Sequence, residues 1–438
     1  MLDATERCGG YTSRAMTEAL REALPAVPAS AAGTAVSRNP FTVGGYRIWW
    51  IASVFAGSGV GIQAVTVQLF VRDRVAEGDR AAFFAAALIC QTVPGAIFAL
   101  FGGVIADRHE RRGILVRTYS VAAAVSLVYV ALAGLEVSYV WPVFILSAII
   151  GSAGAFTNPA RQSMMPQILR QEQIQNGAIF GTMAFMATLQ FGGPMIGGFL
   201  SDWVGLTFAF GSEVAMLAVA ALLFGLIATD KPVPTGKSVR QDLVEGLRYI
   251  RTAPSLLGIL ALGTVPGIFV MGPFAVTVVL MVEDVFVRSD KWVGVLWGCY
   301  GGGIVLGSII MSFIRFERRG LLVSASVLMG GMLLAGYGAS STLWLSMVLL
   351  ISMGMVGPAI FINFAVALLQ ENSDRAMMGR VMSMYGLTFV ASTPVGYLQS
   401  GIQASLWGPQ VTIASSSLIA AFIGLLAVLF LRPVNRLR

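Results

Sequence analysis

The sequence has few charged residues and almost no histidine. Asp, Glu, Lys and Arg make up only 12% of its 438 residues, whereas 56% are hydrophobic. A soluble domain carries about twice that share of charge, so this chain could not cover a water-facing surface. The lone His109 and the three dispersed cysteines give neither a metal-ligand spacing nor a disulfide pattern. We therefore expect a membrane protein that holds no metal and no other cofactor.

Missing signatures also narrow the function classes. The predicted membrane segments contain one acidic residue and no histidine, so they offer no catalytic cluster of the kind that a membrane enzyme needs. The absence of a Walker-type phosphate loop argues against ATP-driven transport by this chain. The net charge of +7 does not indicate nucleic-acid binding, because the basic residues are spread over short loops. We expect neither an enzyme nor a nucleic-acid-binding protein.

Apolar stretches dominate the chain from Tyr46 onward. Twelve of them are long enough, or nearly so, to span a bilayer as helices. Their predicted bounds are 46–71, 81–106, 113–134, 139–157, 177–200, 204–228, 254–281, 291–314, 320–338, 342–364, 379–402 and 408–431. They group into two six-helix bundles, 45–228 and 254–431. A solvated linker over 229–253 is expected to carry a short amphipathic helix, Val239–Arg251.

Basic residues predict how the chain lies in the membrane. Twenty-four of the 29 Lys and Arg fall in the terminal tails and in the loops on one side of the predicted bilayer. The other side has Arg72, Arg74, Arg80, Arg288 and Lys291. Because cytoplasmic loops carry the excess of basic residues, both tails, 1–44 and 432–438, are predicted to be cytoplasmic. Residues 1–44 lack an apolar core of signal-peptide length and are expected to be disordered. This placement leaves no Lys or Arg for the membrane interior.

A charged loop is repeated at about half the length of the chain. Residues 110–116 read Glu-Arg-Arg-Gly-Ile-Leu-Val, and residues 317–323, which begin 207 positions later, read Glu-Arg-Arg-Gly-Leu-Leu-Val. Two related halves inside a hydrophobic chain are typical of secondary transporters.

The first copy of this loop resembles the signature between helices 2 and 3 of the major facilitator superfamily. The matching residues are Gly103, Asp107, Arg108, Arg111 and Arg112. The resemblance implies the major facilitator fold, an all-α polytopic membrane protein with twelve helices in two six-helix bundles. Asp107 would face the start of the eleventh span near Gly379-Arg380 and form, with the arginines, a latch of the outward-facing state. The alternative is that the arginines only enforce the topology. Glu110 replaces a glycine of the pattern.

A second motif lies in the fifth span. Gly193, Pro194, Gly197 and Gly198 resemble the core of a motif associated with exporters in this superfamily, although Leu189 occupies the place of an upstream glycine. Proline removes a helix hydrogen bond and glycine permits close approach, so we expect this helix to be kinked and tightly packed. The chain is also similar to enterobactin-exporter-like proteins and their drug-exporting relatives. That resemblance implies export rather than uptake.

Glu213 is the one acidic residue that falls well inside a predicted span. A charge at the bilayer centre costs roughly 3 kcal/mol or more, so this side chain should face a cavity or be protonated. We predict that Glu213 binds the proton that drives transport. The alternative is a protonated glutamic acid that hydrogen-bonds between helices, and the sixth helix is not the usual coupling position in the superfamily.

Amide side chains in the spans are the candidates for a substrate cavity. These are Gln63, Gln91, Gln190 and Asn363, of which Gln63 and Gln190 lie nearest the middle of the membrane. An amide can equally join two helices, and that alternative stays open.

The sequence thus predicts a transporter of the bacterial plasma (inner) membrane that exports a siderophore or an amphipathic drug-like molecule by alternating access in exchange for protons. Its expected partners are the small-molecule substrate, protons and membrane lipid, with an outer-membrane efflux protein as a further candidate. A monomer is expected. The alternative is uptake of a small metabolite by symport. An arginine inside the membrane would favour an acidic substrate, and none is expected.

Overall fold

The computed structural model describes residues 38–228, 239–314, 316–374 and 377–437. Side chains within 100–108, 239–244 and 246 lie outside this description. The predictions for residues 1–37 of the N-terminal tail and for 229–238 of the linker also fall outside it. Within the described residues every regular element is a helix, and no strand occurs.

Among the described residues, seven α-helices belong to the first half of the chain, α9 lies in the predicted linker, and eight more follow it. The first group is α2 (Gly44–Arg72), α3 (Arg80–Arg108), α4 (Arg111–Gly134), α5 (Trp141–Ile168), α6 (Ile174–Ala187), α7 (Gly193–Trp203) and α8 (Leu206–Gly225). The remainder are α9 (Val239–Thr252), α10 (Pro254–Pro266), α11 (Gly272–Leu280), α12 (Lys291–Phe313), α13 (Arg319–Ala339), α14 (Leu343–Val356), α15 (Pro358–Glu371), α16 (Met378–Phe430) and α17 (Arg432–Asn435).

Several helices continue one another through irregular turns. Five-residue π-helical segments connect α6 to α7 at Thr188–Gly192 and α10 to α11 at Gly267–Met271, and another follows α11 at Met281–Val285. Such π-bulges often accompany functional bends in helices. The first one directly precedes the Gly193-Pro194 pair, so the helix is irregular at the place where a kink was predicted.

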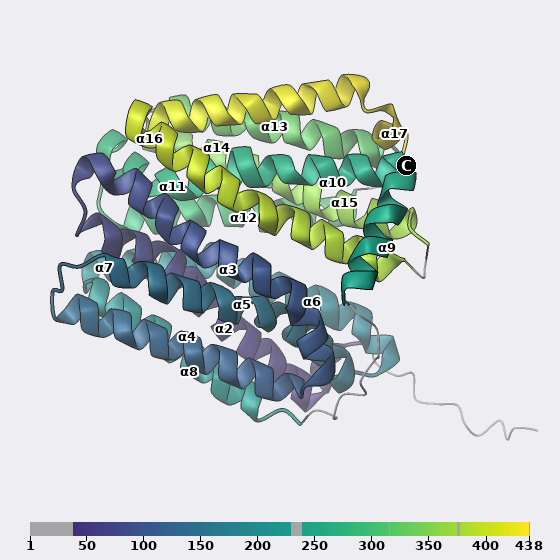
Figure 1. Ribbon diagram of the computed structural model, residues 1–438, viewed down its shortest axis with the longest axis horizontal. Helices are drawn as coiled ribbons and strands as arrows, with labels where there is room; N and C mark the ends of the chain where they lie inside the picture. The colour runs from purple at the N-terminus through teal and green to yellow at the C-terminus, as the bar shows by residue number, and fades with distance from the viewer. Residues whose placement is uncertain (1–37, 229–238, 315, 375–376, 438) are drawn as a thin grey trace, which may run out of the picture. The chain divides into compact units, whose positions relative to one another are not determined.

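Eleven helices among the described residues are long and apolar enough to cross a bilayer. The longest, α16, has 53 residues, or about 80 Å at helical rise, whereas the hydrocarbon core is about 30 Å thick. Gly408 interrupts it with a φ of 78°, and Figure 1 shows α16 as two arms that meet at one end. Each arm has the length that the eleventh and twelfth predicted spans require. The count of twelve itself stays a prediction.

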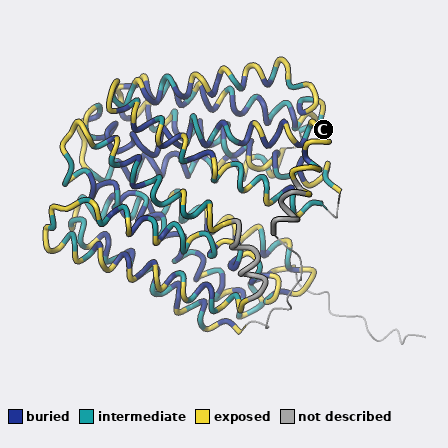
Figure 2. The backbone as a smooth tube through the Cα atoms, viewed as in Figure 1, coloured by how far each residue is buried: buried dark blue, intermediate teal, exposed yellow. Residues whose placement is uncertain are grey.

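Helix pairs within each half and between the halves form the packed body. In the first half, α2 packs against α7 and α8, α3 against α5, and α4 against α5 and α8. In the second half, α13 packs against α14 and α16, and α12 packs against α14. The halves meet mainly where α3 contacts α16 and where α7 contacts α12. Figure 2 shows buried segments toward the interior and exposed segments along the periphery. The exposed residues include large apolar ones such as Leu222.

The placement of basic residues needs one correction. The prediction ended the fourth span at residue 157, before Pro159, but α5 continues through Pro159 and Pro166 to Ile168. Membrane helices tolerate proline because neighbouring helices and side chains compensate for the lost hydrogen bond. Arg161 therefore lies inside a membrane-length helix, and Arg117 lies inside α4. The predicted end of the fourth span at residue 157 was therefore too early.

The C-terminal segment packs against the second half. Val434 is fully buried, and the Ser324 hydroxyl donates a hydrogen bond to the Asn435 side chain at 2.8 Å. The Gly320 N–H donates to the Leu437 carbonyl at 3.1 Å. These contacts fix the end of the chain to the start of α13.

Candidate functional site

Three ion pairs connect the two halves at one end of the helices. Arg72 contacts Asp290, with a hydrogen bond from Nη2 to Oδ2 of 3.1 Å, and both side chains are largely buried. We call this end the Arg72 end, and the opposite end, which carries Arg111 and Arg380, the Arg111 end. The other two pairs at the Arg72 end are Arg80–Glu283 at 2.8 Å and Lys291–Asp202 at 3.5 Å. Separating such a pair leaves two partly buried charges without a partner, so these contacts oppose opening at this end.

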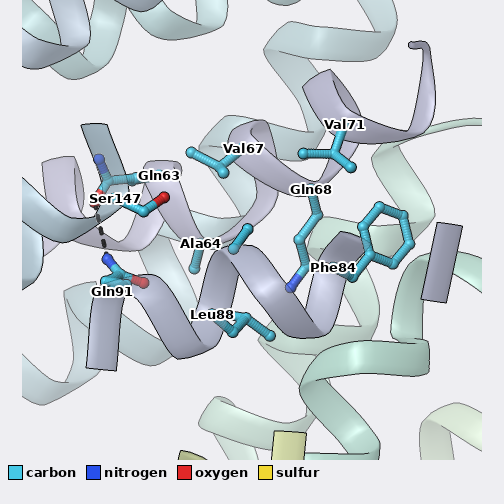
Figure 3. Close-up of a pocket in the computed structure, with 10 residues that line it drawn as sticks. Gln63, Ala64, Val67, Gln68, Val71, Phe84, Leu88, Gln91 and Ser147 are labelled. Atoms are coloured by element: carbon cyan, nitrogen blue, oxygen red, sulfur yellow. Dashed lines mark hydrogen bonds between the residues drawn. The ribbon is translucent and has the colours of Figure 1, made fainter. Parts of the chain in front are cut away.

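A small polar cavity lies between α2, α3 and α5 in the first half (Figure 3). Gln63 and Gln91 face each other across it, with a long hydrogen bond of 3.5 Å from the Gln91 Nε2 to the Gln63 Oε1. Ser147 and Gln68 also line this cavity. Its volume is about 30 Å³, which is enough for a water molecule and far below the 300–1,000 Å³ of a typical ligand site.

Gln68 connects this cavity to the second half. Its Nε2 donates a hydrogen bond of 2.9 Å to the Ala275 carbonyl of α11, while its Oε1 is buried without a hydrogen bond among the described residues. The sequence analysis did not single out Gln68. Its signal would have been the amide itself, because a polar side chain inside an apolar membrane helix needs a hydrogen-bond partner on another helix.

The other two predicted cavity residues lie elsewhere. Asn363 on α15 is exposed and donates hydrogen bonds to the Ser308 hydroxyl at 3.0 Å and to the Ala359 carbonyl at 2.7 Å. Gln190 belongs to the π-helical segment, where its backbone carbonyl packs against Gly301 of α12. The structure thus brings Gln63 and Gln91 together and leaves Gln190 and Asn363 outside their cavity.

Glu213 of α8 is fully buried inside the first half. The Ser126 hydroxyl of α4 lies 2.6 Å from the Glu213 Oε1 and 2.9 Å from the Ala122 carbonyl, so its single proton is shared between these two acceptors. Thr66 of α2 is close enough to interact with the carboxyl, but its hydroxyl already donates to the Ile62 carbonyl at 3.1 Å. The Glu213 Oε2 consequently has no hydrogen-bond donor, and no basic side chain within the described ranges pairs with this carboxyl. An ionised carboxylate would be costly here, whereas the neutral form is compatible with such surroundings.

The charged loop between the second and third spans lies at the Arg111 end. Arg111 donates a hydrogen bond of 3.0 Å from Nε to the Ser163 hydroxyl of α5, and Arg112 is exposed. The side chains of Gly103, Asp107 and Arg108 lie outside the described residues. Arg380, near which Asp107 is expected to pair, contacts Glu245 of α9 at 2.7 Å.

The glycines of the fifth span lie at close contacts between helices. A Cβ atom on Gly193 would lie 2.5 Å from the Ser58 carbonyl of α2, and one on Gly197 would lie 3.0 Å from the Ile62 carbonyl. A Cβ on Gly198 would lie 2.9 Å from the Cα of Gly294 in α12. This motif therefore packs one helix against α2 within its own half and against α12 of the other half.

Arg161 is a buried cation that the sequence analysis placed in a loop. Its side chain is 2% exposed and stacks over the Phe185 ring, with 3.8 Å between the guanidinium carbon and the ring centroid. Its Nε has no hydrogen-bond partner among the described residues, and the same is true of the hydroxyl of nearby Tyr119. The cation–π contact offsets part of the cost of burying this charge.

Comparison with known proteins decides the family. The family described as "Transmembrane secretion effector", of the major facilitator superfamily, matches residues 35–438. The chain belongs to this family. Macrolide efflux protein A of Streptococcus pyogenes is 24% identical over 323 residues, which cover 72% of this chain and 79% of the relative. Enterobactin exporter EntS of Escherichia coli O81 is 24% identical over 352 residues, or 78% of this chain and 82% of the relative.

Solved structures of other transporters share the fold. A D-xylose–proton symporter superposes with a TM-score of 0.70 at 12% identity, covering 88% of this chain and 96% of that chain. A bacterial homologue of the human lysosomal transporter Spinster, in an inward-facing and unoccupied conformation, gives a TM-score of 0.66 at 14% identity over 89% of this chain and 98% of that chain. The major facilitator fold and the transporter class are thus confirmed, and the protein is a multi-pass membrane transporter related to exporters rather than an enzyme.

Proposed function

We propose that this transporter exports a siderophore or an amphipathic drug-like molecule by alternating access in exchange for protons. The names of the sequence relatives, a macrolide efflux protein and an enterobactin exporter, support export of a large organic molecule. Such a substrate does not fit the cavity of about 30 Å³ between Gln63 and Gln91. We therefore expect it to bind between the halves in a state more open than the ion-paired Arg72 end allows.

The three ion pairs at the Arg72 end support an inward-facing assignment for the described state. The distribution of basic residues predicts that this end faces the outside and that both termini lie in the cytoplasm. Arg72–Asp290, Arg80–Glu283 and Lys291–Asp202 would then close the external side. This is the state in which an exporter binds its substrate from the cell.

The buried Glu213 is the observation that carries the proposed proton coupling. It lies deep in the bundle, accepts a hydrogen bond from Ser126 and has no basic partner among the described residues. We propose that it gains a proton from outside when the Arg72 end is open and loses that proton to the cytoplasm as substrate binds. Each proton moving inward supplies about 2.3 kcal/mol per 100 mV of membrane potential, plus the pH term.

Gating and cavity roles follow for the other predicted residues. We propose that Asp107 and Arg108, with Gly103, Arg111 and Arg112, close the Arg111 end in the outward-facing state, when Arg380 leaves Glu245. Gln63 and Gln91 already lie next to each other, so they are the better candidates for contact with a polar group of the substrate. Gln190 and Asn363 would reach a substrate only in another state of the helices.

Location and assembly are proposed from the same reasoning. The transporter would lie in the bacterial plasma membrane as a monomer, with both termini in the cytoplasm. An outer-membrane efflux protein stays a candidate partner. The predicted units, 1–44, 45–228, 229–253, 254–431 and 432–438, are retained as proposals.

Transport into everted membrane vesicles tests the function directly. A panel of macrolides and catecholate siderophores would be offered under an imposed pH gradient to vesicles with wild type, Glu213→Gln or the exposed control Glu172→Gln. We expect gradient-driven accumulation in wild type and the control, and loss in Glu213→Gln with substrate binding retained. Equal transport by Glu213→Gln would make this residue a helix-packing contact. Accumulation only in right-side-out vesicles would instead establish uptake by symport.

A further inference from the structure

A long groove runs along the periphery of the first half. Figure 1 shows α5 between α3 and α4, and the groove has α5 as its floor with the other two helices as its walls. Its volume is about 740 Å³. This is a different place from the small Gln63–Gln91 cavity, which lies on the other side of α5 toward α2.

The groove is lined by apolar side chains that remain partly open to the surroundings. Ile145 and Ile149 on the floor are 53% and 40% exposed, and Phe98 and Val121 on the walls are each 42% exposed. All three helices are long and apolar enough to cross a bilayer, so lipid is the expected surrounding of this face. Acyl chains are the natural occupants of such a surface.

The hydroxyl groups in the groove are already bonded within their own helices. Thr118 donates to the Ile114 carbonyl at 2.9 Å, and Ser152 donates to the Ala148 carbonyl at 2.7 Å. They therefore do not call for a polar ligand. A sugar-like or peptide-like solute would find few partners in this groove.

Arg117 is the exception to the apolar lining. It lines the groove from α4, and it is exposed six residues, or about 9 Å, inside that helix. No acidic side chain pairs with it among the residues that the structure describes. A guanidinium at this depth needs an anion or must extend toward the membrane surface. The nearest abundant anions at a bilayer are lipid phosphates.

The length of the groove matches one leaflet. Its floor runs from Phe144 to Phe156, twelve residues or about 18 Å along α5. Half of a 30 Å hydrocarbon core is about 15 Å. Arg117 lies toward the Arg111 end of this floor, since α4 begins at Arg111 and α5 approaches that end beyond Phe156. Arg117 is thus near the end of the floor at Phe156, and the apolar floor extends from there toward the Arg72 end, to within three residues of the start of α5.

We propose that this groove is a binding site for an anionic phospholipid of the leaflet at the Arg111 end. The phosphate pairs with Arg117, and one acyl chain lies along α5 from Phe156 toward Ile149, between α3 and α4. The site stands whether or not the transporter exchanges substrate for protons. Because α3 also contacts α16 of the second half, a bound lipid would touch a helix that moves when the halves rearrange.

Native mass spectrometry of the purified full chain in detergent would measure how many lipid molecules bind and how tightly. Phosphatidylglycerol and phosphatidylcholine with identical chains would be titrated into wild type, Arg117→Gln, Ala148→Phe and Arg112→Gln. Ala148→Phe fills the groove, and Arg112→Gln removes an exposed charge of the same helix that does not line it. We expect wild type and Arg112→Gln to bind one phosphatidylglycerol about fivefold more tightly than phosphatidylcholine, as one basic residue near a lipid surface supplies. Arg117→Gln should lose that preference, and Ala148→Phe should lose the bound lipid.

Three outcomes would overturn the proposal. One is equal affinity of wild type for both lipids. Another is a preference that survives in Arg117→Gln, and the third is a preference that falls equally in Arg112→Gln, which would indicate diffuse surface charge. Thermal unfolding of each variant shows whether it folds. If Ala148→Phe does not fold, the comparison of Arg117→Gln with Arg112→Gln decides the question alone.

Discussion

Arg72, the last residue of α2, pairs with Asp290 immediately before α12, so two positions 218 residues apart close one end of the transporter. Arg80–Glu283 and Lys291–Asp202 reinforce the same boundary. All three pairs join the first half to the second. The protein can open at this end only when these three pairs break. Their strength should therefore determine the fraction of molecules that are open at the Arg72 end.

Removing one member of the Arg72–Asp290 pair should favour the state that is open at this end. We expect Asp290→Asn to raise labelling of a cysteine placed at the buried position Val71 by an impermeant maleimide about tenfold, since a partly buried pair contributes on the order of 1–2 kcal/mol. The background would lack Cys8, Cys90 and Cys299.

Two further variants control that measurement. Arg288→Gln removes a charge from the same loop and should leave the labelling rate at its wild-type value. The exchanged pair Arg72→Asp with Asp290→Arg should restore slow labelling. Fast labelling in the exchanged pair would show that the Arg72–Asp290 interaction does not hold this end closed.

The contact between Gly198 and Gly294 should tolerate no side chain. A Cβ on Gly198 would lie 2.9 Å from the backbone of Gly294, so Gly198→Ala must separate α7 from α12. We expect a loss of about 1–3 kcal/mol of stability and reduced transport. Thermal unfolding in detergent would measure the first effect. Gly192→Ala, where no atom lies within 4 Å of the added Cβ, is the matched control, and an equal shift in both variants would contradict the prediction.

When the buried Arg161 is replaced, the change in stability should depend on the volume of the new side chain more than on its charge. Arg161→Met fills similar space and removes an unpaired cation, so we expect stability within about 1 kcal/mol of wild type. Arg161→Ala leaves a cavity beside Phe185 and should cost about 2–4 kcal/mol. Chemical and thermal unfolding of both variants would test this. A large loss of stability in Arg161→Met would instead indicate that the charge of Arg161 itself stabilises the fold.

Glu213→Gln should fold normally if the carboxyl is neutral in the described state. The amide has the same shape and can still accept the hydrogen bond from Ser126, so we expect a change in stability below about 1 kcal/mol. Glu213→Ala should be worse by about 2 kcal/mol, because it leaves the Ser126 hydroxyl without this acceptor and opens a void. A large loss in Glu213→Gln would indicate that the group is ionised.

Helix positions were predictable because the length of an apolar run decides whether a segment can cross a bilayer. The main error was at the end of the fourth span, which was predicted at residue 157 although α5 continues through Pro159 to Ile168. Because of that error, Arg161 was predicted to lie in a loop, whereas its side chain is buried within α5. The sequence offered a signal, since Arg161 is followed by the apolar pair Met164 and Met165 at helical spacing, and both are buried.

The candidate site was predictable only in part, because side chains on distant segments meet through packing. Gln63 and Gln91 were proposed together and do meet, yet Gln190 and Asn363 face other helices. The pairing of Arg72 with Asp290 depends on how the halves are juxtaposed, which no local pattern encodes. The glycine motif was more informative, because close packing is a direct property of residues without a Cβ.

The meeting of Gly198 with Gly294 lies near one end of α12 rather than at its middle. From Gly294 to Phe313 the helix extends 19 residues, or about 28 Å. The two glycines allow the backbones of α7 and α12 to cross closely. If the halves tilt around this crossing point, the longer part of α12 moves farther than the shorter part. A tilt of about 10° would then displace the far end by about 5 Å, while the near end scarcely shifts. A small displacement near the ion pairs of the Arg72 end would thereby produce a larger opening at the Arg111 end.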